Sequence, residues 1–216
     1  MAAAVKPRII ADDNKGRKAS KEFRRQQLID ATIDCLAEHG YSDTTLAGVS
    51  DRAGLSRGII NFHFESKENL LIATLQFLAD EYAANWKDAV AKAGENPVEQ
   101  LRALVHADFN RNVNTRRKLA AWCAFWGEAR SRPTYNALCG ARDAAYQELV
   151  RKLCRQIANE THHPGDSDVI ALSLDSLLEG LWLRMMLAPQ DIKLDRAREA
   201  AMEFLRNAFP KHYPRE

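Results

Sequence analysis

The sequence predicts an all-α protein, with a small N-terminal three-helix domain of the helix-turn-helix type and a larger C-terminal helical domain. Three observations support this prediction. Apolar residues recur at helical spacing along nearly the whole chain, and the apolar–polar alternation of β-strands is scarce. Glycine, proline and hydroxyl residues separate the periodic segments where helices are expected to begin and end. With 46% hydrophobic and 28% charged residues, the chain is expected to be globular.

The first half of the chain divides into four helical segments and a tail. Residues 1–19 form a basic and flexible tail. Residues 20–65 form the three-helix domain: Gly40 ends its first helix, Thr44 or Thr45 caps the second, Gly54 ends that helix, and Ser56 caps the third. A linking helix over residues 66–93 follows the cap Ser66, and the "GENP" sequence ends it.

Residues 94–216 form the second domain. It is expected to hold short helices over 97–112, a helix over 117–131, long helices over 133–160 and 167–188, and a last helix from Asp195 to near Pro210. Pro133 suits the first turn of its helix. The segment 167–188 is apolar almost all round, so it must be buried on every side. One side can face its own domain, and the other predicts a homodimer through helices 133–160 and 167–188.

Charge is distributed unevenly at the start of the chain. Residues 6–25 carry eight basic and three acidic side chains, whereas residues 26–55 have a net charge of −4. The basic run suits a phosphate backbone, and a solvated, partly disordered tail is the alternative.

The remaining composition predicts a cytoplasmic protein. Four scattered cysteines without a C-x-x-C motif indicate reduced thiols and no metal site or disulfide framework. His162 and His163 are adjacent in a loop and lack chelating spacing. The chain has no signal peptide and no apolar run of membrane-spanning length, and nothing indicates a cofactor.

The two short helices around "AGLS" have the length and turn of a helix-turn-helix. On the second of them, Ile60 and Phe64 lie on one face, and Arg57 and Asn61 lie on another. Arginine can bind a guanine edge and asparagine an adenine edge. Gly58 costs the helix about 1 kcal/mol relative to alanine and would let the backbone approach DNA. The alternative is a small solvated helix in an all-helical domain.

The run "FRRQQLIDATIDCLAEHGYSDTTLAGVSDRAGLSRGIINFHFESKENLL" resembles the N-terminal domain of the TetR family of bacterial transcriptional regulators. The resemblance implies that the following residues meet DNA: Thr45, Arg57, Gly58, Asn61, His63 and Lys67. Ser56 joins them because it opens the second short helix, and a helix N-terminus with free N–H groups can bind phosphates and base edges. The resemblance also implies phosphate contacts for His63 and Lys67, and base contacts for Arg57 and Asn61. Leu46 and Ala47 replace residues that are often basic or polar in the family, and Asn61 replaces a frequent tyrosine.

The C-terminal sequences "KLAAWCAFWGEAR" (118–130) and "LLEGLWLRMML" (177–187) resemble the ligand domain of the choline-responsive repressors of glycine betaine synthesis. At 3.6 residues per turn, Trp122, Phe125 and Trp126 share an arc of roughly 100°. On the other segment, Asp175, Glu179 and Trp182 share a face. Aromatic faces with a carboxylate are typical of quaternary ammonium sites. These aromatics could instead be ordinary core, or line a pocket for another apolar or cationic metabolite.

These features predict a ligand-responsive, sequence-specific DNA-binding regulator, most simply a repressor released by a small-molecule effector. Two recognition helices about 34 Å apart would meet a palindromic operator. A ligand that tilts the linking helix would weaken binding, for which a coupling of roughly 1–3 kcal/mol is sufficient. An enzyme with a helical pocket is disfavoured because the sequence lacks a nucleophile elbow, a phosphate loop and a metal motif. A ligand-independent DNA-binding protein is disfavoured because the basic charge is confined to the front end.

Overall fold

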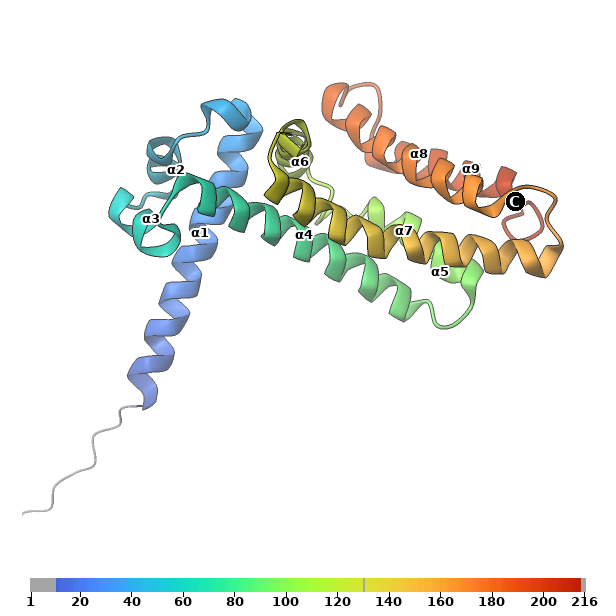
Figure 1. The fold of residues 1–216 in the computed structure, drawn as a ribbon, viewed down its shortest axis with the longest axis horizontal. Helices are drawn as coiled ribbons and strands as arrows, with labels where there is room; N and C mark the ends of the chain where they lie inside the picture. The colour runs from blue at the N-terminus through green and yellow to red at the C-terminus, as the bar shows by residue number, and fades with distance from the viewer. Residues whose placement is uncertain (1–10, 130, 215–216) are drawn as a thin grey trace, which may run out of the picture.

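The computed structural model describes residues 11–129 and 131–214, and every regular element within these ranges is an α-helix (Figure 1). The all-α prediction is therefore confirmed. The helices are α1 (Ala11–Asp43), α2 (Leu46–Ala53), α3 (Arg57–Phe64), α4 (Lys67–Lys92), α5 (Pro97–Asp108), α6 (Arg116–Ala129), α7 (Pro133–Thr161), α8 (Ser167–Leu187) and α9 (Leu194–Ala208). No helix in the described ranges is long and apolar enough to cross a membrane.

The N-terminal domain packs α2 and α3 against α1 and the start of α4 (Figure 1). Its core side chains are fully or almost fully buried: Leu28, Ile29, Ile33, Val49, Ile60 and Phe64. Thr45 caps α2, and its hydroxyl accepts a hydrogen bond from the Gly48 amide at 3.1 Å. Gly54 then takes a left-handed conformation, with φ of 62°, that favours glycine. This turn sets the direction in which α3 leaves α2.

The first helix differs from its predicted range because it begins at Ala11 and not near residue 20. Asp12 and Asp13 suit the positive end of a helix dipole, and the residues that follow include several good helix formers. At the other end, Gly40 has a non-helical backbone with φ of 75°, so the regular helix is interrupted where the sequence predicted its end. Residues 1–10 of the predicted tail lie outside the described residues.

The helix α4 connects the two domains (Figure 1). Ser66 caps it by accepting a hydrogen bond from the Asn69 amide at 3.1 Å, as the sequence predicts for a helix over 66–93. Leu70 and Leu71 are buried near its start, and Tyr82 and Trp86 are buried near its end. A change in the tilt of α4 would therefore displace buried side chains in both domains.

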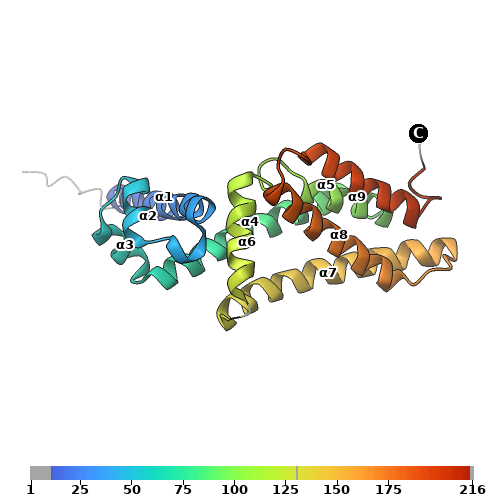
Figure 2. The same ribbon diagram turned by 90° about the horizontal axis from the view of Figure 1, so that it is seen from above.

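The helix α6 lies crosswise between the domains (Figure 2) and packs extensively on α1. Arg117 on α6 donates hydrogen bonds to Asp34 at 2.7 Å and to Asp30 at 2.9 Å, both on α1. Nearby, the hydroxyl groups of Tyr41 and Tyr135 lie 2.9 Å apart. These contacts hold the N-terminal domain against α6 and the start of α7.

A buried ion pair joins α4 to α6. The Lys118 ammonium donates to both carboxylate oxygens of Glu81, at 2.7 and 2.6 Å, and to the Asn112 carbonyl at 2.7 Å. The Lys118 side chain is 9% exposed and the Glu81 side chain 31% exposed. Removing one partner of such a pair leaves an uncompensated charge out of water.

We therefore expect unequal costs from breaking this pair. Glu81→Ala should lower the free energy of unfolding by about 2 kcal/mol, less than the roughly 3–5 kcal/mol of fully buried pairs, because Glu81 is partly solvated. Lys118→Met should cost less than about 1 kcal/mol, because an apolar side chain replaces the buried charge. Urea denaturation measures both.

The matched control is the exposed pair Lys92–Asp88, whose side chains are 75% and 61% exposed. Asp88→Ala should change stability by no more than about 0.5 kcal/mol. If Lys118→Met lowered the free energy of unfolding by as much as Glu81→Ala or by more, the buried charge of Lys118 would not explain the stability of this ion pair.

Candidate DNA-binding surface and ligand cavity

The helix α3 has one face in the core and one face in solvent. Ile60 and Phe64 are 0% and 5% exposed and fix the helix to the domain. The following residues are exposed and fall within an arc of about 140°: Arg57, Gly58, Asn61 and Phe62. Three of the residues in this arc are ones that the sequence analysis assigns to DNA: the donors Arg57 and Asn61, and Gly58.

The structure places the other residues assigned to DNA at the ends of α2, α3 and α4. Thr45 is exposed, with its hydroxyl engaged in capping α2. Ser56 occupies the N-cap position of α3, but its side chain makes no capping hydrogen bond, contrary to the expectation from the sequence. Lys67 opens α4, with its ammonium 5.8 Å from the centroid of the Tyr41 ring.

His63 lies beside basic residues of α1. Partial burial lowers the pKa of His63, and the positive charges of Lys21 and Arg25 lower it further. The imidazole is therefore mainly neutral at pH 7 and would meet a phosphate as a hydrogen-bond donor.

Phe62 is the exposed residue on α3 that the sequence analysis did not assign to DNA. It is 70% exposed, with the Lys21 ammonium 5.3 Å from its ring centroid and the His63 ring 5.2 Å away. An apolar side chain on a DNA-facing helix can contact a thymine methyl group. The signal in the sequence was an aromatic residue next to Asn61, outside the apolar face formed by Ile60 and Phe64.

The C-terminal domain contains a cavity between its helices. Its described lining residues include four aromatic rings and three carboxyl groups, and none is basic. They are Tyr82, Asp108, Trp126, Tyr146, Gln147, Asp175, Leu178, Glu179 and Trp182. Each of α4, α5, α6, α7 and α8 contributes at least one of them.

Asp108 is the centre of the hydrogen bonding around this cavity. It is only 2% exposed, and its carboxylate accepts hydrogen bonds from the hydroxyl groups of Tyr82 at 2.5 Å and Tyr146 at 2.8 Å. Its carbonyl accepts from the Trp182 indole at 3.2 Å. Burial, and then the negative charge of Asp108, raise the pKa of Tyr146 well above its usual value, so this tyrosine stays a donor.

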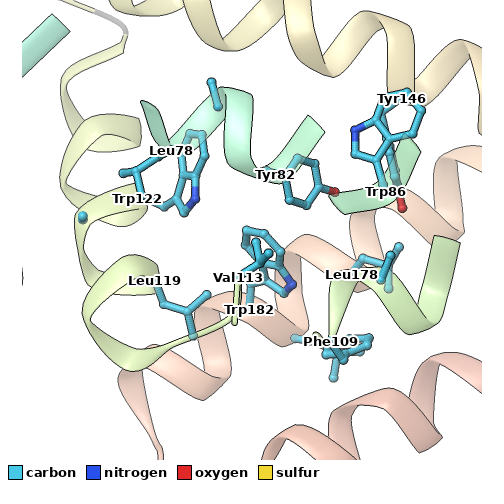
Figure 3. Packing of buried hydrophobic residues seen from close by; sticks show 14 of the residues in the cluster. Leu78, Tyr82, Trp86, Phe109, Val113, Leu119, Trp122, Tyr146, Leu178 and Trp182 are labelled. Carbon is cyan, nitrogen blue, oxygen red and sulfur yellow. The ribbon is translucent and has the colours of Figure 1, made fainter. Parts of the chain in front are cut away.

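The aromatic rings at the cavity are fixed against one another. The Tyr82 and Trp182 rings meet edge to face with their centroids 5.4 Å apart, and the centroid of the Tyr146 ring lies 5.9 Å from that of Tyr82. Figure 3 shows Tyr82 between Trp182 and the pair formed by Tyr146 and Trp86. The Trp126 and Trp182 rings stack at 6.5 Å. Gln147 donates to the Asp175 carboxylate at 2.9 Å. Rings and carboxylates are thus held in place around one small space.

The structure divides the predicted ligand residues into two groups. Trp126, Asp175, Glu179 and Trp182 line the cavity. Trp122 does not: it is 1% exposed and packs in the core, 6.2 Å from the Trp126 ring.

Phe125 also lies away from the cavity, since it packs on Tyr41 at 6.4 Å and Tyr135 at 5.5 Å, at the junction of the domains. The three aromatic residues of α6 share an arc, but α6 lies between the two domains. Different residues of the arc therefore meet different neighbours, and only Trp126 reaches the cavity.

Sequence reasoning missed five cavity residues: Tyr82, Asp108, Tyr146, Gln147 and Leu178. Tyr82 belonged to the apolar stripe of the linking helix, and Asp108 is an acidic residue inside the run "LVHADF", which is buried except for His106. A carboxylate in an apolar stretch was the one signal in the sequence. The described residues contain no group of three His, Cys, Asp or Glu side chains placed to hold a metal ion.

A solvent-facing helix of the helix-turn-helix type, joined by one long helix to a cavity in a second domain, is typical of a DNA-binding regulator controlled by a ligand. The comparisons with known proteins agree. Residues 28–74 match the bacterial regulatory proteins of the tetR family, and residues 97–210 match the C-terminal domain of BetI-type transcriptional repressors. The chain belongs to the TetR family, with a BetI-type C-terminal domain, and is a ligand-responsive transcriptional regulator of the repressor type.

Curated relatives cover most of the chain. The HTH-type transcriptional regulator BetI 1 of Chromohalobacter salexigens is 32% identical over 183 residues, 85% of this chain and 89% of the relative. BetI of Burkholderia thailandensis is 38% identical over 176 residues, covering 80% and 88%. Regulators of this family bind operator DNA and small-molecule effectors, typically as dimers.

Solved structures share the fold. A transcriptional regulator of Pseudomonas aeruginosa superposes with a TM-score of 0.75 at 26% identity, over 89% of this chain and 93% of that one. A regulator of Saccharomonospora viridis, solved in complex with choline, has a TM-score of 0.71 at 19% identity over 85% and 96%.

We expect Gly58→Ala to separate folding from DNA binding. An added Cβ would meet only the Ser56 hydroxyl oxygen within 4 Å, at 3.7 Å. The free energy of unfolding should rise by up to about 1 kcal/mol, since alanine favours helix. Operator affinity should fall by about tenfold, or 1.4 kcal/mol, if DNA approaches this backbone. Thermal denaturation and fluorescence anisotropy measure the two effects.

Gly127→Ala in α6 is the matched control, because nothing lies within 4 Å of its added Cβ. It should leave operator affinity unchanged. Unchanged affinity in Gly58→Ala as well would show that DNA does not approach α3 at this position.

Proposed function

We propose that the effector is a small quaternary ammonium cation of the choline type, bound in the cavity around Asp108. The observation that carries the proposal is the set of four aromatic rings and three carboxyl groups, with no basic side chain among the described lining residues. A desolvated cation over an aromatic face gains about 2 kcal/mol or more. A regulator of the same fold was solved in complex with choline, which supports a ligand of this chemical class.

The cavity residues take distinct roles in this proposal. Trp126, Trp182, Tyr82 and Tyr146 supply ring faces for the methyl groups of the cation. Asp108, Asp175 and Glu179 supply negative charge, and Glu179 is the most exposed of the three. We assign the site no catalytic role. Burial raises the pKa of the Cys123 thiol on α6, which makes this thiol a poor nucleophile.

The regulator is proposed to act as a homodimer through α7 and α8. In one chain α8 exposes four large apolar side chains along a single stripe: Val169, Leu172, Leu183 and Leu187. Ser176 and Gly180 lie on the same stripe and permit close approach. On α7, Ala137, Gly140 and Ala144 are exposed small residues. Pairing of α7 and α8 across a two-fold axis would bury this surface as a four-helix interface.

Each protomer would then present α3 to one half of a palindromic operator, at a spacing of about 34 Å. Arg57 and Asn61 are assigned to base edges, with Gly58 allowing close approach. Thr45, Ser56, His63 and Lys67 are assigned to phosphates. Such a protein acts in the cytoplasm, where its operator DNA lies.

Ligand binding is proposed to reach α3 through α4 and α6. Tyr82 on α4 and Trp126 on α6 both line the cavity. At their other ends, Lys67 on α4 follows α3 directly, and Arg117 on α6 is hydrogen bonded to Asp30 and Asp34 of α1. A cation that moves either helix changes the position of both α3 helices and weakens operator binding.

We expect choline to stabilise the protein, by about 2.7 kcal/mol at a concentration one hundred times its Kd. Its uncharged isostere 3,3-dimethylbutan-1-ol should bind at least tenfold more weakly, because the cation–π attraction is absent. Trp126→Leu should weaken choline binding by about tenfold or more for the same reason. Thermal shift and isothermal titration calorimetry measure these effects.

Operator binding without choline is the folding check for the Trp126→Leu protein. Equal affinity for choline and its isostere, or unchanged choline affinity in the variant, would contradict the proposed site.

We expect Leu172→Glu to convert the protein to a monomer of 24.4 kDa. Leu172 is 65% exposed in one chain, so the substitution spares the fold, but it places a charge in the proposed interface. Sedimentation velocity measures the mass.

The control is Phe23→Glu on α1, where an apolar side chain is 69% exposed outside the proposed interface. It should leave the dimer intact. A dimer retained in Leu172→Glu at micromolar concentration would contradict the assignment.

A further inference from the structure

The start of α1 extends beyond the three-helix domain. Figure 1 shows α1 continuing as a straight helix past α3, away from α2 and α4. The helix begins at Ala11, ten residues before Lys21. At 1.5 Å per residue, this extension reaches about 15 Å beyond Lys21, roughly four base-pair steps of 3.4 Å.

Five basic residues of the extension and of the turns that follow it lie on one stripe of α1. Successive residues of an α-helix are rotated by 100°, so five basic positions fall within an arc of about 120°. They are Arg17, Lys18, Lys21, Arg24 and Arg25.

The stripe is continuous with the face of α3 that is assigned to DNA. The contact on that face is made by Lys21, whose ammonium lies 5.3 Å from the ring centroid of the exposed Phe62. One turn further along α1, the Arg25 guanidinium lies 5.5 Å from the ring of Phe64, on the core face of α3. Lys21 and Arg24 are exposed. Positive charge therefore runs from the edge of the recognition helix along α1, without a break in the helix.

We propose that this basic stripe binds the phosphate backbone of the duplex flanking the half-site that α3 contacts, one arm for each protomer. Charge complementarity and continuity with α3 identify double-stranded DNA as the occupant. The arm adds affinity that depends on salt and not on flanking sequence, because phosphates carry no sequence information. The inference rests on the proposed placement of α3 against the operator.

The test compares two duplexes that contain an operator selected from random-sequence DNA by the wild-type protein. One duplex ends at the outer edge of the half-sites, and the other carries six further base pairs of arbitrary sequence on each side. The variant is Arg17→Gln with Lys18→Gln, since glutamine keeps a good helix propensity. The control is Lys193→Gln with Arg196→Gln, two exposed positions on the far domain that remove the same charge.

Operator affinity is measured by anisotropy over a range of salt concentrations. Wild type and control should bind the longer duplex more tightly than the shorter one, and the arm variant should bind both alike. On the longer duplex, the plot of log K against log salt should be shallower for the variant. The slope should fall by roughly 0.9 for each phosphate that the arm no longer neutralises, or by up to roughly 3.6 for four phosphates in a dimer.

Two results would overturn the inference: equal wild-type affinity for both duplexes, or a length effect that persists in the arm variant. Either leaves the function of α3 intact. A wild-type protein that selects no operator at all would instead contradict the proposed placement of α3 on DNA.

Discussion

The buried carboxylate of Asp108 determines how the helices of the C-terminal domain are arranged. A carboxylate removed from water is costly unless several donors satisfy it. Here Tyr82 of α4 and Tyr146 of α7 donate to the carboxylate, and Trp182 of α8 donates to the carbonyl of the same residue. These three aromatic side chains also line the cavity. The interaction that holds four helices together thus also fixes the walls of the proposed ligand site.

This arrangement links the cavity to the DNA-binding domain through rigid elements. Tyr82 lies on α4, and the first turn of α4 follows α3 along the chain. One helix therefore connects the cavity to the recognition helix. The crosswise helix α6 provides a second connection, with Trp126 at the cavity and Arg117 on α1. Coupling between two sites requires an element whose position both sites influence, and α4 and α6 both meet that condition.

The sequence predicted the local structure well and the cavity only in part. Helix limits followed from caps and breakers such as Ser66 and Gly54, because these act within a few residues. Periodicity cannot show which neighbour a buried face meets, so Phe125 was assigned to the ligand although it packs at the domain junction. Asp108 was missed for the same reason, since its role depends on tyrosines that are distant in sequence. The start of α1 was placed too late because a run of charged residues was interpreted as a tail.

Cation binding and operator binding are expected to use one coupled set of helices. Linkage requires that operator DNA weaken choline binding by the same factor by which choline weakens operator binding. Calorimetric titration of choline into the free protein and into its operator complex measures this directly. We expect choline to bind the operator complex more weakly than the free protein by roughly 5- to 150-fold. Equal affinity for both forms, or no binding to either, would contradict a cation site that is coupled to operator binding.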